Sequence, residues 1–251
     1  KSGKFNASIN AVEFGTGDKA VKIGGENVFP LYSFDAAIEN APKVGIEITD
    51  FGMEHEPECI KKYYEGCATL ADMARKAASM EGVDFLSFRM EGGDPNGANK
   101  STEELIGELK EIADAVDLPL VVCGCKNVEK DAELFSKAAE ALNGKNAVIL
   151  SAKEENYKTV GAAAGLAYKQ VVGAESAVDI NLAKQLNVLI SQLGVDSKSV
   201  VMNVGTAAVG YGFEYVISTM DRVKAAALQQ GDANLQMPII TPVASEAWGV
   251  K

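Results

Sequence analysis

The chain has 251 residues, 47% of them hydrophobic and 24% charged, which is enough apolar material for one sizeable core. Its formal net charge of −11 excludes the basic footprint of a nucleic-acid binder and disfavours anionic membranes. Its apolar runs are all far shorter than the roughly 20 residues that span a bilayer.

The cysteines and the N-terminus indicate the cellular setting. Four cysteines are too few for a disulfide scaffold in a chain of this length, so we expect a cytoplasmic protein. The first ten residues are polar and lack the apolar region of a signal peptide. Because the chain begins with Lys1 and not Met, we expect the natural start to lie upstream.

Residues 1–43 form a lead-in that differs from the rest of the chain. Ser8–Phe14 and Ala20–Ile23 flank the turn-forming run Gly15–Asp18, a pattern that predicts a β-hairpin. We expect this hairpin to close the bottom of a barrel.

From residue 44 to 251, short apolar runs alternate with amphipathic helices. Near-continuous Val, Ile and Leu content is typical of parallel strands buried on both faces, and the helices supply the crossovers. The predicted strands are Val44–Asp50, Val83–Met90, Leu120–Cys125, Ala147–Ala152, Val171–Ala174, Val200–Val204 and Ile239–Val243.

Helix boundaries are marked by capping residues. Ser101, followed by Glu104 three residues later, predicts a helix start, and Asp179 predicts another. Gly144 and Gly194 are expected to end the helices that precede them.

Seven strand–helix units predict an α/β fold, either a TIM (β/α)8 barrel or an open doubly wound sheet. A barrel without its eighth strand would leave two edges unpaired. The alternatives at this point are therefore an open sheet or a barrel truncated after strand 7.

Chemistry in parallel α/β folds lies at the carboxyl ends of the strands, so the loops there supply the candidate ligand-binding residues. The glycine-rich run Gly205–Tyr215 is the strongest candidate. It has P-loop glycine spacing, but Tyr211 stands where the lysine belongs, which argues against nucleotide phosphate. The full candidate set is Asp94, Asn96, Asn99, Asn156, Tyr157, Asp179, Asn181, Gly205, Thr206, Gly210, Tyr211 and Gly212.

Two further features of the sequence are candidate sites. His55, the only histidine, lies between two glutamates, but a solvated loop is the favoured interpretation over a metal ligand. Cys123 and Cys125 are two residues apart, so both sulfurs are expected on one face, and a packing role is favoured. We predict neither a metal site nor a catalytic set in this chain, since the sequence has no nucleophile–histidine constellation.

At these loops the sequence resembles the small subunit of corrinoid iron–sulfur proteins, also called the delta subunit of the acetyl-CoA decarbonylase/synthase complex. The resemblance runs from about residue 8 to the end. Its motifs occur in the same order as in the family: Glu91–Asn99, Pro119–Cys125, Val128–Asp131, Glu155–Lys158, Asp179–Asn181, Lys184–Asn187, Gly210–Tyr215, Met237–Ile239 and Glu246–Trp248.

The resemblance implies a TIM barrel in a heterodimer with a large subunit that carries a [4Fe–4S] cluster. It also implies a corrinoid, a cobalamin-type cobalt cofactor, held between the two subunits. The cobalt would carry a methyl group from a methyltetrahydropterin, via a methyltransferase, to acetyl-CoA synthase/CO dehydrogenase in the reductive acetyl-CoA pathway. The small subunit would then belong to a methyl-transfer system without being catalytic alone. Family members continue through an eighth strand and helix, so we expect residues beyond Lys251.

Two alternatives stay open. The chain is an autonomous pterin-binding TIM-barrel methyltransferase, with Asp94, Asn96, Asp179 and Asn181 on the pterin edge, or it is a purely structural subunit. Binding of methyltetrahydrofolate by the isolated chain would favour the first of these.

Overall fold

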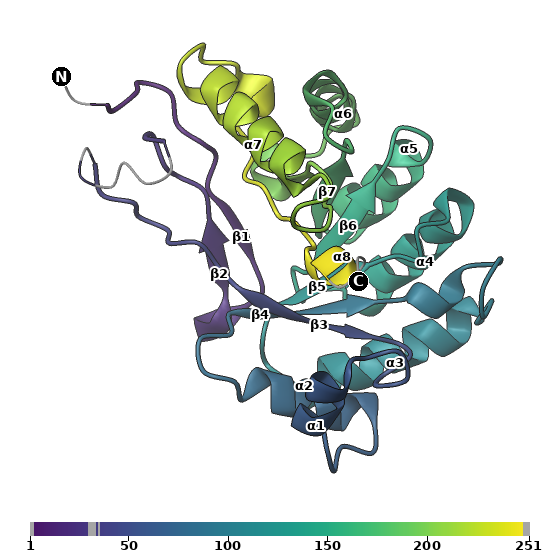
Figure 1. The fold of residues 1–251 in the computed structure, drawn as a ribbon. Helices are drawn as coiled ribbons and strands as arrows, with labels where there is room; N and C mark the ends of the chain where they lie inside the picture. Colours follow the sequence, from purple (N-terminus) through teal and green to yellow (C-terminus); the bar gives the residue numbers. More distant parts are fainter. Residues whose placement is uncertain (1–2, 30–33, 35, 248–251) are drawn as a thin grey trace.

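The computed structural model describes residues 3–29, 34 and 36–247, and these form a mixed α/β fold (Figure 1). Six parallel strands pair in sequence order: β3 (Gly45–Thr49), β4 (Phe85–Arg89), β5 (Leu120–Cys123), β6 (Val148–Ala152), β7 (Val171–Glu175) and β8 (Val200–Asn203). The first six predicted strands are therefore confirmed, each within a few residues of its expected bounds. Trp248, the last residue of the resemblance motifs, lies outside the described residues.

Helices connect successive strands and cover the outer face of the curved sheet (Figure 1). Ser101 Oγ accepts a hydrogen bond from Glu104 N (3.1 Å), and Asp179 Oδ1 accepts from Asn181 N and Leu182 N, which confirms both predicted caps. The helices are α1 (Glu58–Tyr63), α2 (Leu70–Ala78), α3 (Thr102–Ala115), α4 (Val128–Ala141), α5 (Tyr157–Val160) with its π-helical continuation Gly161–Ala167, α6 (Ile180–Gln192), α7 (Phe213–Leu228) and α8 (Ala244–Ala247). Among the described helices, none is long and apolar enough to cross a bilayer.

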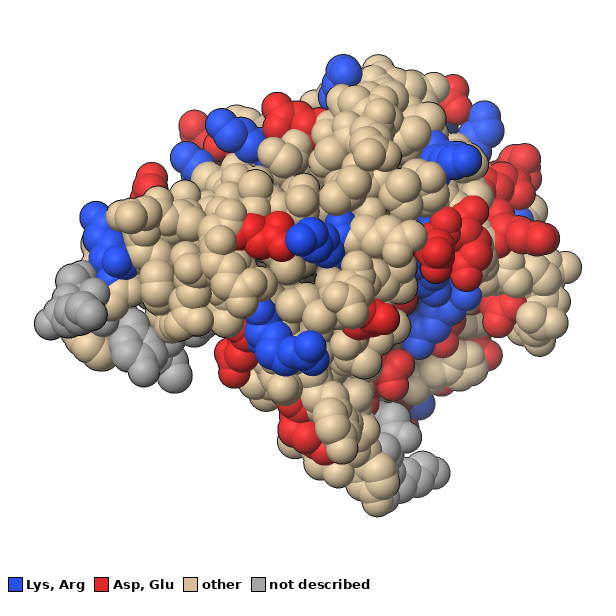
Figure 2. Space-filling model, turned by 90° about the horizontal axis from the view of Figure 1, so that it is seen from above, with Lys and Arg blue, Asp and Glu red and all other residues tan. Residues whose placement is uncertain are grey.

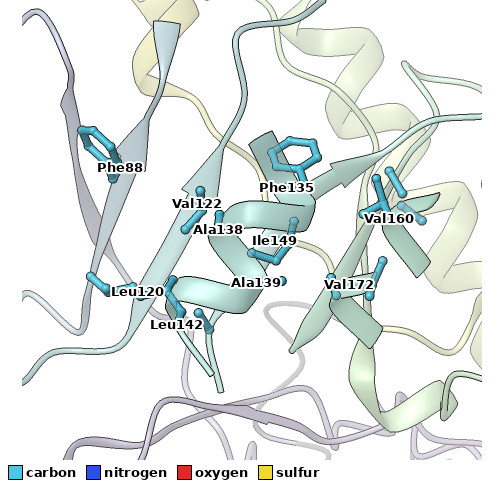
Figure 3. Close-up of a cluster of buried hydrophobic side chains, with 14 of the residues drawn as sticks. Phe88, Leu120, Val122, Phe135, Ala138, Ala139, Leu142, Ile149, Val160 and Val172 are labelled. Atoms are coloured by element: carbon cyan, nitrogen blue, oxygen red, sulfur yellow. The ribbon is translucent and has the colours of Figure 1, made fainter. Parts of the chain in front are cut away.

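Successive side chains along each strand point to opposite faces of the sheet, and each face has its own core. Leu120 and Val122 on β5 join the large core beneath the helices, together with Phe88 and Phe135 (Figure 3). Val121, the residue between them, belongs to a smaller cluster on the inner face. Because neighbouring residues of a strand point to opposite faces, a strand buried on both sides must be apolar throughout.

The hairpin covers one end of the inner face. β1 (Val12–Phe14) and β2 (Val21–Ile23) pair antiparallel, and Phe14 packs with Val121 and Val148 in the inner cluster. Gly15 in the turn has a φ of +83°, and a Cβ there would overlap the ring of Pro119. Since Pro119 directly precedes β5, the hairpin lies at the amino ends of the strands.

The seventh predicted strand, Ile239–Val243, is reduced to a single parallel bridge. Met202 N donates to Pro238 O (2.8 Å), and Ile240 N donates to Met202 O (2.9 Å). Between this segment and β3 lies a cavity of about 690 Å³ with a largely apolar lining that includes Phe85 and Ile217. Within the described residues, the sheet is thus parallel and curved but not closed.

Charges of both signs are interspersed on the face shown in Figure 2, and no basic stripe crosses it.

Candidate functional site

A cavity of about 300 Å³ opens at the carboxyl ends of the strands. Five neighbouring strands contribute side chains at or near their last residues, among them Arg89, Cys123, Ser151, Glu175 and Asn203. This is the end of the sheet at which parallel α/β folds place their chemistry.

An ion pair on the inner face lies at this site and is largely shielded from solvent. Arg89 donates from Nε to Glu47 Oε1 and from Nη2 to Glu47 Oε2, both at 2.9 Å. The two side chains are only 7% and 8% exposed. Burial alone would lower the pKa of Arg89, but the hydrogen-bonded Glu47 carboxylate and neighbouring groups outweigh it and raise the pKa overall. Arg89 is therefore a fixed cation.

Cys123 lies beside this pair, with its sulfur 3.5 Å from Ser87 Oγ. Burial raises the pKa of its thiol to about 11, so the thiol is neutral at physiological pH and a poor nucleophile. Cys125 packs in the helix-side core, and burial raises its pKa to about 12. The packing role of both cysteines is confirmed. The prediction that they share a face is wrong: the strand ends at Cys123, which belongs to the inner cluster, whereas Cys125 belongs to the helix-side core.

Asn203 connects three strand ends. Its Nδ2 donates to Ser151 Oγ (3.0 Å) on β6 and to Glu175 Oε2 (3.4 Å) on β7. Its Oδ1 accepts from Gly205 N (3.0 Å), which fixes the start of the glycine-rich loop. Lys153 Nζ completes this group at 3.6 Å from Glu175 Oε1. One amide thus holds the loop in register with the sheet.

Backbone strain is concentrated at the same cavity. Ala177 and Val178, which line it, have φ values of +44° and +63°. A β-branched residue in the left-handed region is a conformational outlier, and such strain gathers at functional sites. Val178 is held there by a 2.7 Å hydrogen bond from its N to Val204 O.

The segment that contains α8 supplies part of the cavity lining. Pro242, Ser245 and Glu246 line the cavity from this side, and Glu246 Oε1 lies 3.2 Å from Lys126 Nζ. The segment that follows the seventh predicted strand therefore forms part of the site.

Of the candidate residues chosen from sequence, Gly205 and Thr206 line the cavity. Thr206 Oγ1 is shielded from solvent and has no hydrogen-bond partner among the described residues.

The candidates on the loop after β4 fold onto each other. Asp94 Oδ1 accepts from Asn96 N (2.9 Å), and Asn99 N donates to Asp94 O with Asn99 at a φ of +52°. The turn chemistry of this loop accounts for these contacts.

The candidates after β6 and β7 also have local structural partners. Asn156 is buried, accepts from Lys153 N (2.8 Å) and donates to Val128 O (3.2 Å). Tyr157 packs partly against the helix-side core. Asp179 caps α6 by accepting the backbone N–H of Asn181, whose side chain is exposed.

The last three candidates lie on an exposed rim. Gly210 and Gly212 have φ values of +80° and +114°, and they place Tyr211 outward with 72% exposure. Val209 and Tyr215 beside it are 81% and 68% exposed. We call the two tyrosines Tyr211 and Tyr215, together with the aliphatic Val209, the aromatic rim. Exposed apolar groups gathered in this way are typical of an interaction surface.

Sequence reasoning missed the side chains that form the cavity floor, notably Arg89 and Asn203, and also Glu47, which holds Arg89 in place. The available signal was a polar residue at an inward position of an otherwise apolar strand. As for His55, it is exposed and contacts the Phe51 ring edge-on, with ring centres 4.8 Å apart. The described residues contain no group of three His, Cys, Asp or Glu side chains suited to a metal ion.

Comparison with known proteins gives one consistent result. Residues 11–251 match the family model described as CO dehydrogenase/acetyl-CoA synthase delta subunit. The delta subunit of the acetyl-CoA decarbonylase/synthase complex from Methanothermobacter thermautotrophicus is 33% identical over 98% of this chain and 62% of its own length. Its counterpart from Methanopyrus kandleri is 34% identical over 94% of this chain and 58% of its own length. The chain therefore spans about three fifths of these relatives.

Proposed function

Because the chain belongs to the CO dehydrogenase/acetyl-CoA synthase delta subunit family, we propose that it is the small subunit of a cytoplasmic corrinoid iron–sulfur methyl carrier. In this role it assists transfer of a methyl group from a methyltetrahydropterin, by way of cobalt, to acetyl-CoA synthase. Its partners are the large subunit, which holds the [4Fe–4S] cluster, the pterin methyltransferase and acetyl-CoA synthase/CO dehydrogenase.

The observation that carries this proposal is a mouth with paired charges and a neutral thiol, from which the glycine-rich loop continues beyond Thr206 into the exposed aromatic rim. The Arg89 guanidinium is tied to Glu47, and the Cys123 thiol is neutral. Neither supplies acid–base or nucleophilic chemistry. Such a mouth suits a subunit that covers a cofactor and leaves the chemistry to it.

The described residues fit the edge of a corrinoid. A corrin ring is too large for the 300 Å³ cavity, so it would rest on the mouth with the aromatic rim offering flat contact. The cobalt would supply the methyl-accepting and methyl-donating chemistry when the cofactor is bound. Gly205 and Thr206 would contact its periphery, Asn203 would hold the loop that carries them, and Tyr211 would exclude water. The remaining candidates, Asp94, Asn96, Asn99, Asn156, Tyr157, Asp179, Asn181, Gly210 and Gly212, would position the loops that surround it.

The architecture that we propose is a TIM barrel, with residues 1–43 as the lead-in and 44–251 as the barrel up to strand 7. The open cavity between β3 and Ile240 supports this proposal. It lies where a further parallel strand would pair with both neighbours, and its lining is apolar.

The test is the absorbance spectrum of the chain, alone and copurified with the large subunit. We expect corrinoid bands in the heterodimer only. Methyltetrahydrofolate binding by the isolated chain would instead support the autonomous methyltransferase. Equal corrinoid retention by wild type and Tyr211→Ala, Asn203→Ala double-variant heterodimers would support a purely structural subunit.

A further inference from the structure

We infer that the mouth cavity is a subsite for a neutral carboxamide, the –CO–NH2 end of a larger ligand, and that it rejects carboxylates. The inference deepens the proposed function and takes its biological meaning from it. Its physical basis is the charge and hydrogen-bonding inventory of the cavity itself.

The first step is charge balance. Three cations line the cavity, Arg89, Lys126 and Lys153, against three carboxylates, Asp131, Glu175 and Glu246. Each cation also has a carboxylate partner within the ion-pair limit: Glu47 at 2.9 Å, Glu246 at 3.2 Å and Glu175 at 3.6 Å, respectively.

The three cations and three carboxylates of the lining sum to zero, and Glu47, which pairs with Arg89 from behind, adds one negative charge. A guest carboxylate would therefore enter without a free counter-ion and would lose its hydration, which is costly in a partly enclosed site. The overall charge of −11 acts in the same direction.

The second step concerns unused donors and acceptors. Arg89 lines the cavity, and within the described residues its hydrogen bonds to Glu47 use Nε and Nη2 but not Nη1. Lys153 Nζ and Glu175 Oε1 are 3.6 Å apart, which exceeds a hydrogen bond, so the ammonium group and this carboxylate oxygen can each take another partner. The cavity thus offers spare donors and a spare carboxylate acceptor together. A primary amide accepts at oxygen and donates at nitrogen, so it satisfies both without adding charge.

The third step is the strained wall. Ala177 and Val178 hold left-handed conformations beside Glu175. That strain persists only where the surrounding structure imposes it. The turn they form completes the wall between β7 and the glycine-rich loop, since a Cβ on Gly205 would approach Ala177 Cα to 3.3 Å. The conformation of this wall is therefore imposed by the surrounding structure.

The experiment uses the whole chain and three small probes of one shape: propionamide, propionate and propylammonium. Binding is compared by saturation-transfer NMR and by competition. We expect propionamide to bind and propionate to give no signal. Propionate binding as tight as that of propionamide would overturn the inference, as would stronger binding of propylammonium.

The key variant is Glu175→Gln, which removes one negative charge while nearly preserving shape. We expect the ratio of propionamide to propionate affinity to fall by roughly tenfold, equivalent to about 1.4 kcal/mol. Glu140→Gln is the matched control, because Glu140 pairs with Lys137 on the exposed surface of α4. Identical behaviour of the two variants would overturn the inference. Lys153→Met supplies a second variant, which we expect to shift preference toward propylammonium.

The two proposals fail separately. If the heterodimer retains corrinoid but the chain binds no propionamide, the subsite is wrong and the proposed function stands. If propionamide binds and is lost on mutation while no corrinoid is retained, the subsite stands and the proposed function is wrong.

Discussion

Removal of one partner of the Arg89–Glu47 pair is the most direct test of the site geometry. Replacing Glu47 with Leu leaves the Arg89 guanidinium almost fully buried without its two 2.9 Å acceptors. Breaking a buried pair in this way costs about 3–5 kcal/mol in unfolding free energy. An exposed pair such as Lys137–Glu140 is worth ~0.2–1 kcal/mol, so Glu140→Leu is the reference.

The assay is urea unfolding followed by circular dichroism, with the slope checked for two-state behaviour. The double variant Glu47→Leu, Arg89→Met should recover most of the loss, because an apolar replacement removes both buried charges. If Glu47→Leu costs no more than Glu140→Leu, the pair is solvated and the described geometry of the cavity floor is refuted.

Other consequences follow from single positions. Gly15→Ala should lower the unfolding free energy by more than about 1 kcal/mol. Gly144 has the same φ of +83° but open space around it, so Gly144→Ala should cost less. Equal losses of stability in thermal melts of the two variants would contradict this. Asp179→Ala removes two cap hydrogen bonds from α6 and should cost about 0.5–2 kcal/mol by urea unfolding, with Asp179→Asn largely preserving stability. Iodoacetamide at pH 8 should label the exposed Cys59 in the folded chain and spare Cys123, because burial raises the pKa of the Cys123 thiol to about 11 and keeps it protonated. Labelling of Cys123 at the rate of Cys59, measured by mass spectrometry, would contradict the burial of Cys123.

The sequence predicts the sheet well because each strand carries its own signal. Runs such as Val148–Ala152 are apolar throughout, and helix caps such as Asp179 act within three residues. Ile239–Val243 has the same apolar signal but pairs only at Ile239, since a strand needs partners that its own composition does not reveal.

The candidate site was less predictable because its interactions are non-local. Arg89 meets Glu47 across 42 positions, and Asn203 meets Ser151 across 52. The polarity of the loop after β4 predicts Asp94 and Asn96 as ligand-binding residues, but their hydrogen bond closes their own turn. A polar residue at an inward strand position is a subtler signal than a polar loop, but here it marks the cavity more reliably.

The outer edge of β3 has a practical consequence for handling the protein. Among the described strands, β3 pairs with β4 alone, so its other edge offers unpaired backbone groups beside an apolar cavity. Unprotected edges of this kind recruit strands from other chains. Self-association at high concentration should therefore begin at β3. Val44 is 62% exposed at the start of this edge, so Val44→Lys is the substitution that we would choose to prevent it.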